Sequence, residues 1–302
     1  MPLPSSLVGA TTTAHVTEVD VRWTMAYAAG IDDANPRYLD PSAAPVVAHP
    51  LFPVGPEWPV VLDARHLAPA GVLSREEAAR GVHATHDLVV HRLVRPGDVL
   101  TTTATIEGVE QRAPGAYEVL RLDTVDDQGR AVATTRMGTL FLGVDVVGED
   151  RPATDPSSPG PSREGGHTGV AASVIASVPR PVARTAAHVY TECARIWNPI
   201  HTDVAAAQAA GLPDIVLHGT ATLAMAVTTI VDRLAARDPG RVRRIGARFG
   251  ATVLLPSTIE IRVLERHGAE LGDGVEKVWF DVRTQDGAPA IRDGFVVLDH
   301  AG

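Results

Sequence analysis

The fold of this chain is decided by residues 190–225, YTECARIWNPIHTDVAAAQAAGLPDIVLHGTATLAM. The middle of the stretch contains Asn198-Pro199-Ile200-His201, and its end contains His218-Gly219, which opens a run that is apolar on nearly every side. A helix without a polar face has to be buried all round. Strand-like runs elsewhere, such as residues 278–282, indicate that an antiparallel sheet wraps around this helix.

Length and charge narrow the class of protein. The chain has 302 residues and is 45% hydrophobic, which is enough to fill the cores of two ordinary domains. Its net charge is -9, and no block of Lys and Arg offsets this acidic balance. The composition therefore predicts a globular protein that binds neither nucleic acid nor an anionic membrane.

The only cysteine, Cys193, has no partner for an internal disulfide and leaves no Cys-based metal site. The N-terminus lacks a basic segment followed by an apolar core, and no apolar run is long enough to span a bilayer. A cytoplasmic location is the expectation.

Residues 148–169 are rich in Pro, Ser, Gly and charge, which is typical of a flexible linker. They divide the chain into residues 1–147 and 170–302, and the two parts repeat each other. Residues 27–40 echo 193–203, residues 47–50 echo 216–219, and residues 94–100 echo 254–260. Gly129 and Gly287 also mark equivalent hairpin turns. One fold is therefore expected twice.

The N-terminal copy is the more degenerate one. Its central helix is interrupted by Pro53, Pro56 and Pro59, and each proline lacks an amide donor. We expect this helix to be short or to begin only near Pro59.

Asn-Pro-x-His, an Ala-rich helix, and Leu-His-Gly before a buried helix occur in this order. In these features the chain resembles the MaoC-like hydratases, the (R)-specific enoyl-thioester hydratase (hydratase 2) family. The resemblance implies an α+β, double hot-dog fold, in which two antiparallel sheets are each wrapped around a central helix. It also implies that the halves pair edge to edge, with an acyl tunnel along their interface.

The resemblance shows one departure. The family motif is Ser-Gly-Asp-x-Asn-Pro-x-His, in which Asp and His together hold the reacting water. Here Ala194, Arg195 and Ile196 stand at the Ser-Gly-Asp positions, and Ile196 cannot transfer a proton. Only His201 of the pair remains in this half.

The N-terminal half has the complementary loss. Asp33, Asn35 and Pro36 match the motif, and Tyr38 replaces the histidine. The resemblance argues against a joint site of Asp33 and His201, because it places the two half-sites on opposite sides of a pseudo-twofold axis.

The candidate roles follow from the motif. His201 would hold water, and Gly219 would let a backbone N–H at the positive end of the helix point at the thioester oxygen. Glu192, four residues before Ile196, is a candidate substitute carboxylate if this segment is helical; the alternative is a solvated side chain. For Arg195 the alternatives are a substrate carboxylate or phosphate and a surface salt bridge. The candidate site residues are therefore catalytic His201, Asn198 and Gly219, substrate-binding His218, Thr220, Arg195 and Trp197, and Glu192 as the possible substitute carboxylate.

His83, His86 and His91 are a further histidine cluster. On a regular strand His83 and His91 point to one face and His86 to the other, so we expect no metal site. No cofactor motif is present in the sequence.

The sequence therefore predicts a hydratase or dehydratase of an acyl-CoA or acyl-carrier-protein thioester, acting at the α,β-position without a cofactor. Two alternatives remain open: a hot-dog enzyme with another reaction, such as a thioesterase or an isomerase, and a non-catalytic acyl-binding or partner subunit. A homodimer is also left open.

Overall fold

The computed structural model of the chain describes residues 2–42, 44–68, 72–153, 173–267 and 274–300. One antiparallel sheet of ten strands dominates it, in the order β2-β4-β5-β6-β3-β9-β12-β11-β10-β8. Its strands are β2 (His15–Glu18), β3 (Gly81–Val90), β4 (Val99–Arg112), β5 (Gly115–Val125), β6 (Ala131–Leu142), β8 (Val174–Val182), β9 (Val242–Phe249), β10 (Ser257–His267), β11 (Val275–Arg283) and β12 (Pro289–Asp299). Two short strands, β1 (Leu3–Pro4) and β7 (Val146–Val147), pair in parallel beside it.

The strand order is the same when read inward from either end, because each half orders its strands first, third, fourth, fifth and second. The halves join where β3 pairs with β9 in antiparallel register, with Asp87 opposite Gly246. This pairing makes the two expected sheets continuous and confirms the α+β, double hot-dog prediction.

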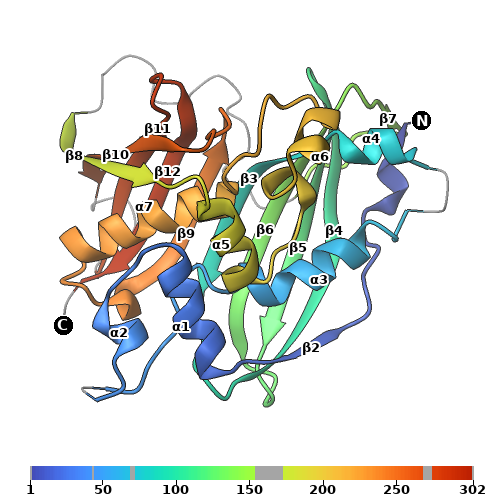
Figure 1. Cartoon of the computed structure of the whole chain (residues 1–302). Helices are drawn as coiled ribbons and strands as arrows, with labels where there is room; N and C mark the ends of the chain where they lie inside the picture. Colours follow the sequence, from blue (N-terminus) through green and yellow to red (C-terminus); the bar gives the residue numbers. More distant parts are fainter. Residues whose placement is uncertain (1, 43, 69–71, 154–172, 268–273, 301–302) are drawn as a thin grey trace.

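The helices lie on one side of the sheet (Figure 1). They are α1 (Val21–Gly30), α2 (Pro36–Leu39), α3 (Val54–Ala64), α4 (Arg75–Ala79), α5 (Ala186–Ala194), α6 (Val204–Ala209) and α7 (Gly219–Leu234), with 3-10 turns at Ser5–Leu7, Pro199–His201 and Pro239–Arg241. In the described part of the chain, none of these helices is long and apolar enough to cross a membrane.

Helix α7 is the core of the C-terminal half. Its residues from Ala221 to Val231 are buried, and Leu223, Val227 and Ile230 have no exposed surface. The side chains around α7 come from β9, β10, β11 and β12, which wrap it. The prediction of a fully buried helix is confirmed.

The N-terminal helix is shorter than α7, with 11 residues against 16, but the expectation that it begins only near Pro59 is wrong. Helix α3 begins at Val54 and runs for 11 residues through both Pro56 and Pro59. Pro56 lies in the first turn, where amide groups have no partner within a helix, so its missing N–H costs little. Pro59 removes one interior hydrogen bond, and burial of Val60 and Val61 offsets that loss.

Helices α1 and α5 cross at the junction of the halves. A Cβ atom on Gly30 would lie 2.6 Å from the Cβ atom of Cys193, so only glycine permits this approach. The rings of Tyr27 and Tyr190 meet edge to face here, and their hydroxyls are 3.3 Å apart. These two tyrosines therefore mark the pseudo-twofold axis.

The hairpin glycines Gly129 and Gly287 have φ values of 74° and 79°, as the sequence predicts. The proposed linker lies mostly outside the described residues, since residues 154–172 are not described. The boundaries 1–147 and 170–302 stay a prediction.

Replacement of Ile230 by Ala tests the core role of α7. Deleting a buried Ile side chain leaves a cavity, so the free energy of unfolding should fall by about 2–5 kcal/mol. Ile175→Ala is the matched control, because Ile175 on β8 is 51% exposed and its loss should cost less than about 1 kcal/mol. Urea unfolding measures both; equal losses would contradict the assignment of α7 as the core.

Candidate active site

The Asn-Pro segment leads from α5 to α6 and positions His201. Helix α5 ends at Arg195, which adopts a left-handed conformation (φ 57°) and turns the chain. The Asn198 side chain then accepts a hydrogen bond from the Ile200 amide and caps the Pro199–His201 turn. Asn198 thus holds the turn that carries His201 and does not present a reacting group.

His201 and His218 come together although 16 residues separate them in the sequence. Their rings stack with centroids 3.6 Å apart and planes 22° apart. The Nδ1 atom of His201 lies 2.8 Å from the Val216 carbonyl oxygen, so Nδ1 carries the proton and donates it. The lone pair of Nε2 is therefore the basic atom of His201.

Burial lowers the pKa of His201 to about 4, and the Val216 carbonyl opposes only part of this shift. The ring is therefore neutral at pH 7 and acts first as a base. Burial and the neighbouring His201 also hold the pKa of His218 well below its ordinary value.

His218 and Tyr190 form the inner wall of the site. His218 Nε2 lies 3.3 Å from the Thr191 hydroxyl, and Tyr190 donates a hydrogen bond of 3.1 Å to Thr220 Oγ1. We did not predict Tyr190 from the sequence. The signal was present, because Tyr27 and Tyr190 each precede an Asn-Pro pair by eight residues.

Gly219 is the first residue of α7, directly after His218. A Cβ atom at Gly219 would lie 3.0 Å from the Phe249 ring, so glycine keeps this approach open. Amides of the first helical turn have no partner within the helix and stand at its positive end. The turn at Gly219 and Thr220 can therefore stabilise a developing oxyanion beside His201.

Ile196, at the motif position of the family's Asp, is 6% exposed and belongs to the hydrophobic core. Among the described residues, no carboxylate forms a hydrogen bond or ion pair with His201. The site therefore contains imidazole, hydroxyl and backbone groups without a neighbouring acid.

Three predicted site residues lie on the surface instead. Glu192 is exposed, and the Trp197 side chain is 62% exposed. Arg195 forms an ion pair of 3.3 Å with Asp20 and stacks over the Trp23 ring. The exposure of Glu192 favours its solvated reading, and the contact with Asp20 favours the salt-bridge reading of Arg195.

The N-terminal half-site is closed by internal hydrogen bonds. Asp33 Oδ2 accepts a 2.7 Å hydrogen bond from Thr228, which follows Gly219 on α7 by nine residues, or about 13 Å along the axis. Tyr38 is fully buried, and its hydroxyl has no hydrogen-bond partner among the described residues. Asp33 therefore does not join His201, as expected.

The face assignment of the histidines in β3 is wrong. A bulge between His83 and Thr85 breaks the alternation and brings the His83 and His86 rings within 5.4 Å on one face. His91 lies just beyond the strand and pairs with Thr134. Among the described residues, no group of three His, Cys, Asp or Glu side chains is arranged to hold a metal.

Two family models match the chain. Residues 168–285 match a model described as a MaoC like domain, and residues 6–135 match a FAS1-like dehydratase domain region. Enoyl-CoA hydratase ChsH3 of Mycobacterium tuberculosis is 32% identical over 105 residues, which cover 33% of this chain and 37% of that protein. Other curated relatives, a plant peroxisomal hydratase and a fly multifunctional enzyme, are matched over 20% and 28% of their length.

Solved structures agree over nearly the whole chain. A MaoC-like dehydratase from Phytophthora capsici superposes with a TM-score of 0.80 at 20% identity, covering 97% of this chain and 96% of the other. A Mycobacterium tuberculosis protein of double hot-dog fold superposes with a TM-score of 0.64 at 17% identity, over 97% and 96%. At these identities the likeness establishes the fold.

His201 should remain neutral, protonated on Nδ1, at pH 6, where a free imidazole with a pKa of about 6.5 is mostly protonated. It should gain its second proton only as the pH falls towards about 4. Nitrogen NMR of labelled histidine measures this, with His201→Gln identifying the signal. A His201 ring that titrates near pH 6.5 would show that its Nε2 is open to water and not buried.

Proposed function

The chain belongs to the MaoC-like dehydratase family, and we propose that it adds water to, or removes water from, the α,β-position of an acyl thioester. The observation that carries this proposal is the placement of His201. The Val216 carbonyl fixes one tautomer of the ring, beside the open N-terminus of α7. The thioester carrier we propose is coenzyme A or an acyl carrier protein, and the two hot-dog units we propose are residues 1–147 and 170–302.

In hydration, Nε2 of neutral His201 takes a proton from water as the water oxygen bonds to the β-carbon. Electrons of the double bond move toward the thioester carbonyl, whose oxygen becomes negative and accepts hydrogen bonds from the first turn of α7. The imidazolium then returns its proton to the α-carbon. One imidazole thus closes the cycle, and dehydration follows the same steps in reverse.

The apolar side chain of Ile196 at the motif position lowers the hydration rate that we expect. A well-placed acid or base contributes roughly 100- to 10,000-fold, and this site has one such group where the family motif has two. A slow hydratase is the reaction most consistent with a neutral His201, because the base is present and the group that orients the water is lost.

Thioester hydrolysis is the second candidate reaction, since the same base and oxyanion position would serve water attack at the carbonyl carbon. The position of the helix terminus favours neither reaction. The products separate them, because hydrolysis releases a free thiol and hydration does not.

His201→Ala should lower crotonyl-CoA hydration by roughly 100- to 10,000-fold, because it removes the proposed base. Tyr38→Phe is the matched control at the equivalent N-terminal position. It removes a hydroxyl that has no hydrogen-bond partner among the described residues, and should leave the rate within about twofold. Loss of absorbance of the enoyl thioester follows the reaction. Equal damage by the two changes would place part of the chemistry in the N-terminal half.

The Ile196→Asp variant should hydrate crotonyl-CoA faster than the wild type does, because the substitution restores a carboxylate at the motif position. Glu192→Gln should leave the rate unchanged, since Glu192 is exposed. Steady-state kinetics with crotonyl-CoA measures both variants. A fast wild-type enzyme that is slowed by Glu192→Gln would instead assign the second proton-transfer group to Glu192.

A further inference from the structure

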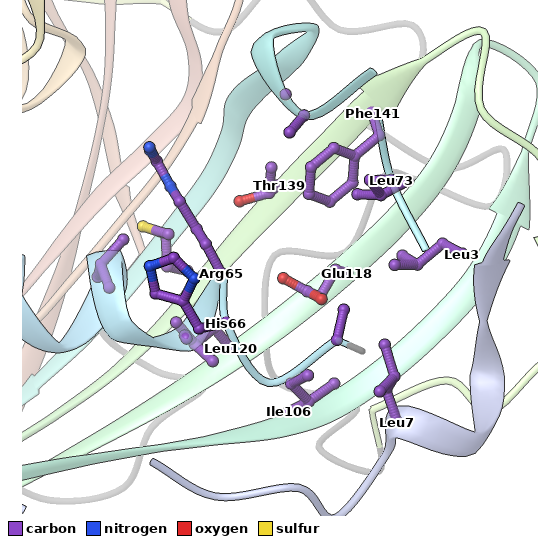
Figure 2. A pocket seen from close by; sticks show the side chains of 16 residues that line it. Leu3, Leu7, Arg65, His66, Leu73, Ile106, Glu118, Leu120, Thr139 and Phe141 are labelled. Carbon is purple, nitrogen blue, oxygen red and sulfur yellow. The ribbon is translucent and has the colours of Figure 1, made fainter. Parts of the chain in front are cut away.

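A cavity of about 280 Å³ lies in the N-terminal half, between α3 and the inner face of β4, β5 and β6. Its walls are mostly apolar and include Leu3, Leu7, Ile106, Leu120 and Phe141. The carboxyl group of Glu118 stands among these side chains (Figure 2). An apolar cavity of this size would hold part of a small molecule, and one carboxyl group would fix its orientation.

Glu118 has no hydrogen-bond or ion-pair partner among the described side chains. Burial raises its pKa to about 7, and no cation opposes the shift. Arg65 and His66 also line the cavity, but both are exposed at its edge. A carboxyl group among apolar walls offers one polar contact, so Glu118 is a candidate partner for a polar group of a ligand that enters the cavity.

Glu57, the other buried glutamate of this half, differs in this respect. Its pKa is also raised to about 7, but Thr135 donates a 2.6 Å hydrogen bond to its Oε1. Glu57 therefore has a hydrogen-bond partner within the fold, whereas Glu118 has none among the described residues.

A row of side chains connects the cavity with the candidate active site. Glu118 on β5 is opposite Thr139 on β6, and Thr139 is opposite His83 on β3. The His83 ring lies 4.6 Å from that of Phe249 on β9, which borders Gly219. With strands about 4.8 Å apart, the row measures roughly 14 Å.

Glu118, Thr139, His83, Phe249 and Gly219 are all partly exposed residues. The first four lie on neighbouring strands of the sheet, and Gly219 begins α7. The row also includes polar residues, because Thr139 and His83 lie between Glu118 and Phe249. A chain that lay along the row would find hydrogen-bonding groups beside it and at its far end.

From this geometry we infer that the cavity receives the far end of an acyl chain whose thioester lies at Gly219, and that Glu118 binds a hydroxyl group on that end. The substrate class is a hydroxylated acyl thioester of medium length. The inference rests on the proposed function for the position of the thioester, and adds the identity of the chain.

A hydroxyl group suits Glu118 better than an amine does. The carboxylate accepts a hydrogen bond from the hydroxyl, and the protonated carboxyl group donates one to it, so both protonation states bind the same ligand. An ammonium ion would have to lose its hydration inside an apolar wall, which a single carboxylate offsets poorly.

The test compares binding of dodecanoyl-CoA with binding of its ω-hydroxy derivative, by titration calorimetry. Wild type should bind the hydroxylated chain about tenfold more tightly, as expected for one hydrogen bond to a buried carboxyl group. Glu118→Leu should remove this preference or reverse it, and Glu118→Gln, which keeps the shape, should reduce it. Glu57→Gln is the matched control and should keep the wild-type preference.

Equal binding of both chains by the wild type would overturn the inference, as would a preference that survives both Glu118 substitutions. Turnover of crotonyl-CoA by the wild type tests the proposed function separately. A protein that fails to hydrate crotonyl-CoA but prefers the hydroxylated chain would refute the reaction and retain the binding site. A protein that hydrates crotonyl-CoA but binds both chains equally would support the reaction and refute the binding site.

Discussion

Burial of α7 inside the C-terminal half of the sheet is the constraint on which the rest of the structure depends. Because the helix has no polar face, the strands must wrap it, and its N-terminus is held at one place relative to β9. That place is where Gly219 meets Phe249 and where His218 stacks on His201. A hydrophobic requirement thus fixes the position of the polar groups that the chemistry needs.

The two halves share one fold but differ at the N-terminus of the central helix. In the C-terminal half, the helix starts directly after His218, so its free amides face the site. In the N-terminal half, His49 is followed by Pro50, which has no N–H, and α3 starts only at Val54. Tyr38 stands at the position equivalent to His201, and the Asp33 carboxylate accepts a hydrogen bond from Thr228. The N-terminal half has therefore kept the architecture without the donor and base of a site.

Burial controls the protonation of the polar groups in both halves. It keeps His201 neutral, lowering its pKa to about 4, and raises the pKa of Glu118 to about 7. For His201 this makes one imidazole competent as a base at neutral pH, which matters because Ile196 supplies no second group. For Glu118 it leaves a carboxyl group that can either accept or donate a hydrogen bond.

By itself, the sequence determined the buried helix and the Asn-Pro-x-His turn, because these depend on local pattern and spacing. The family resemblance carried by these features implied the double hot-dog fold. It also located the missing carboxylate at Ile196. Only the tertiary structure decided which residues meet. A bulge put His83 and His86 on one face, Glu192 and Trp197 came to lie on the surface, and packing allowed α3 to run through Pro59. Glu118 carried no local signal, since its role depends on strands and helices that are distant in the sequence and close a cavity around it.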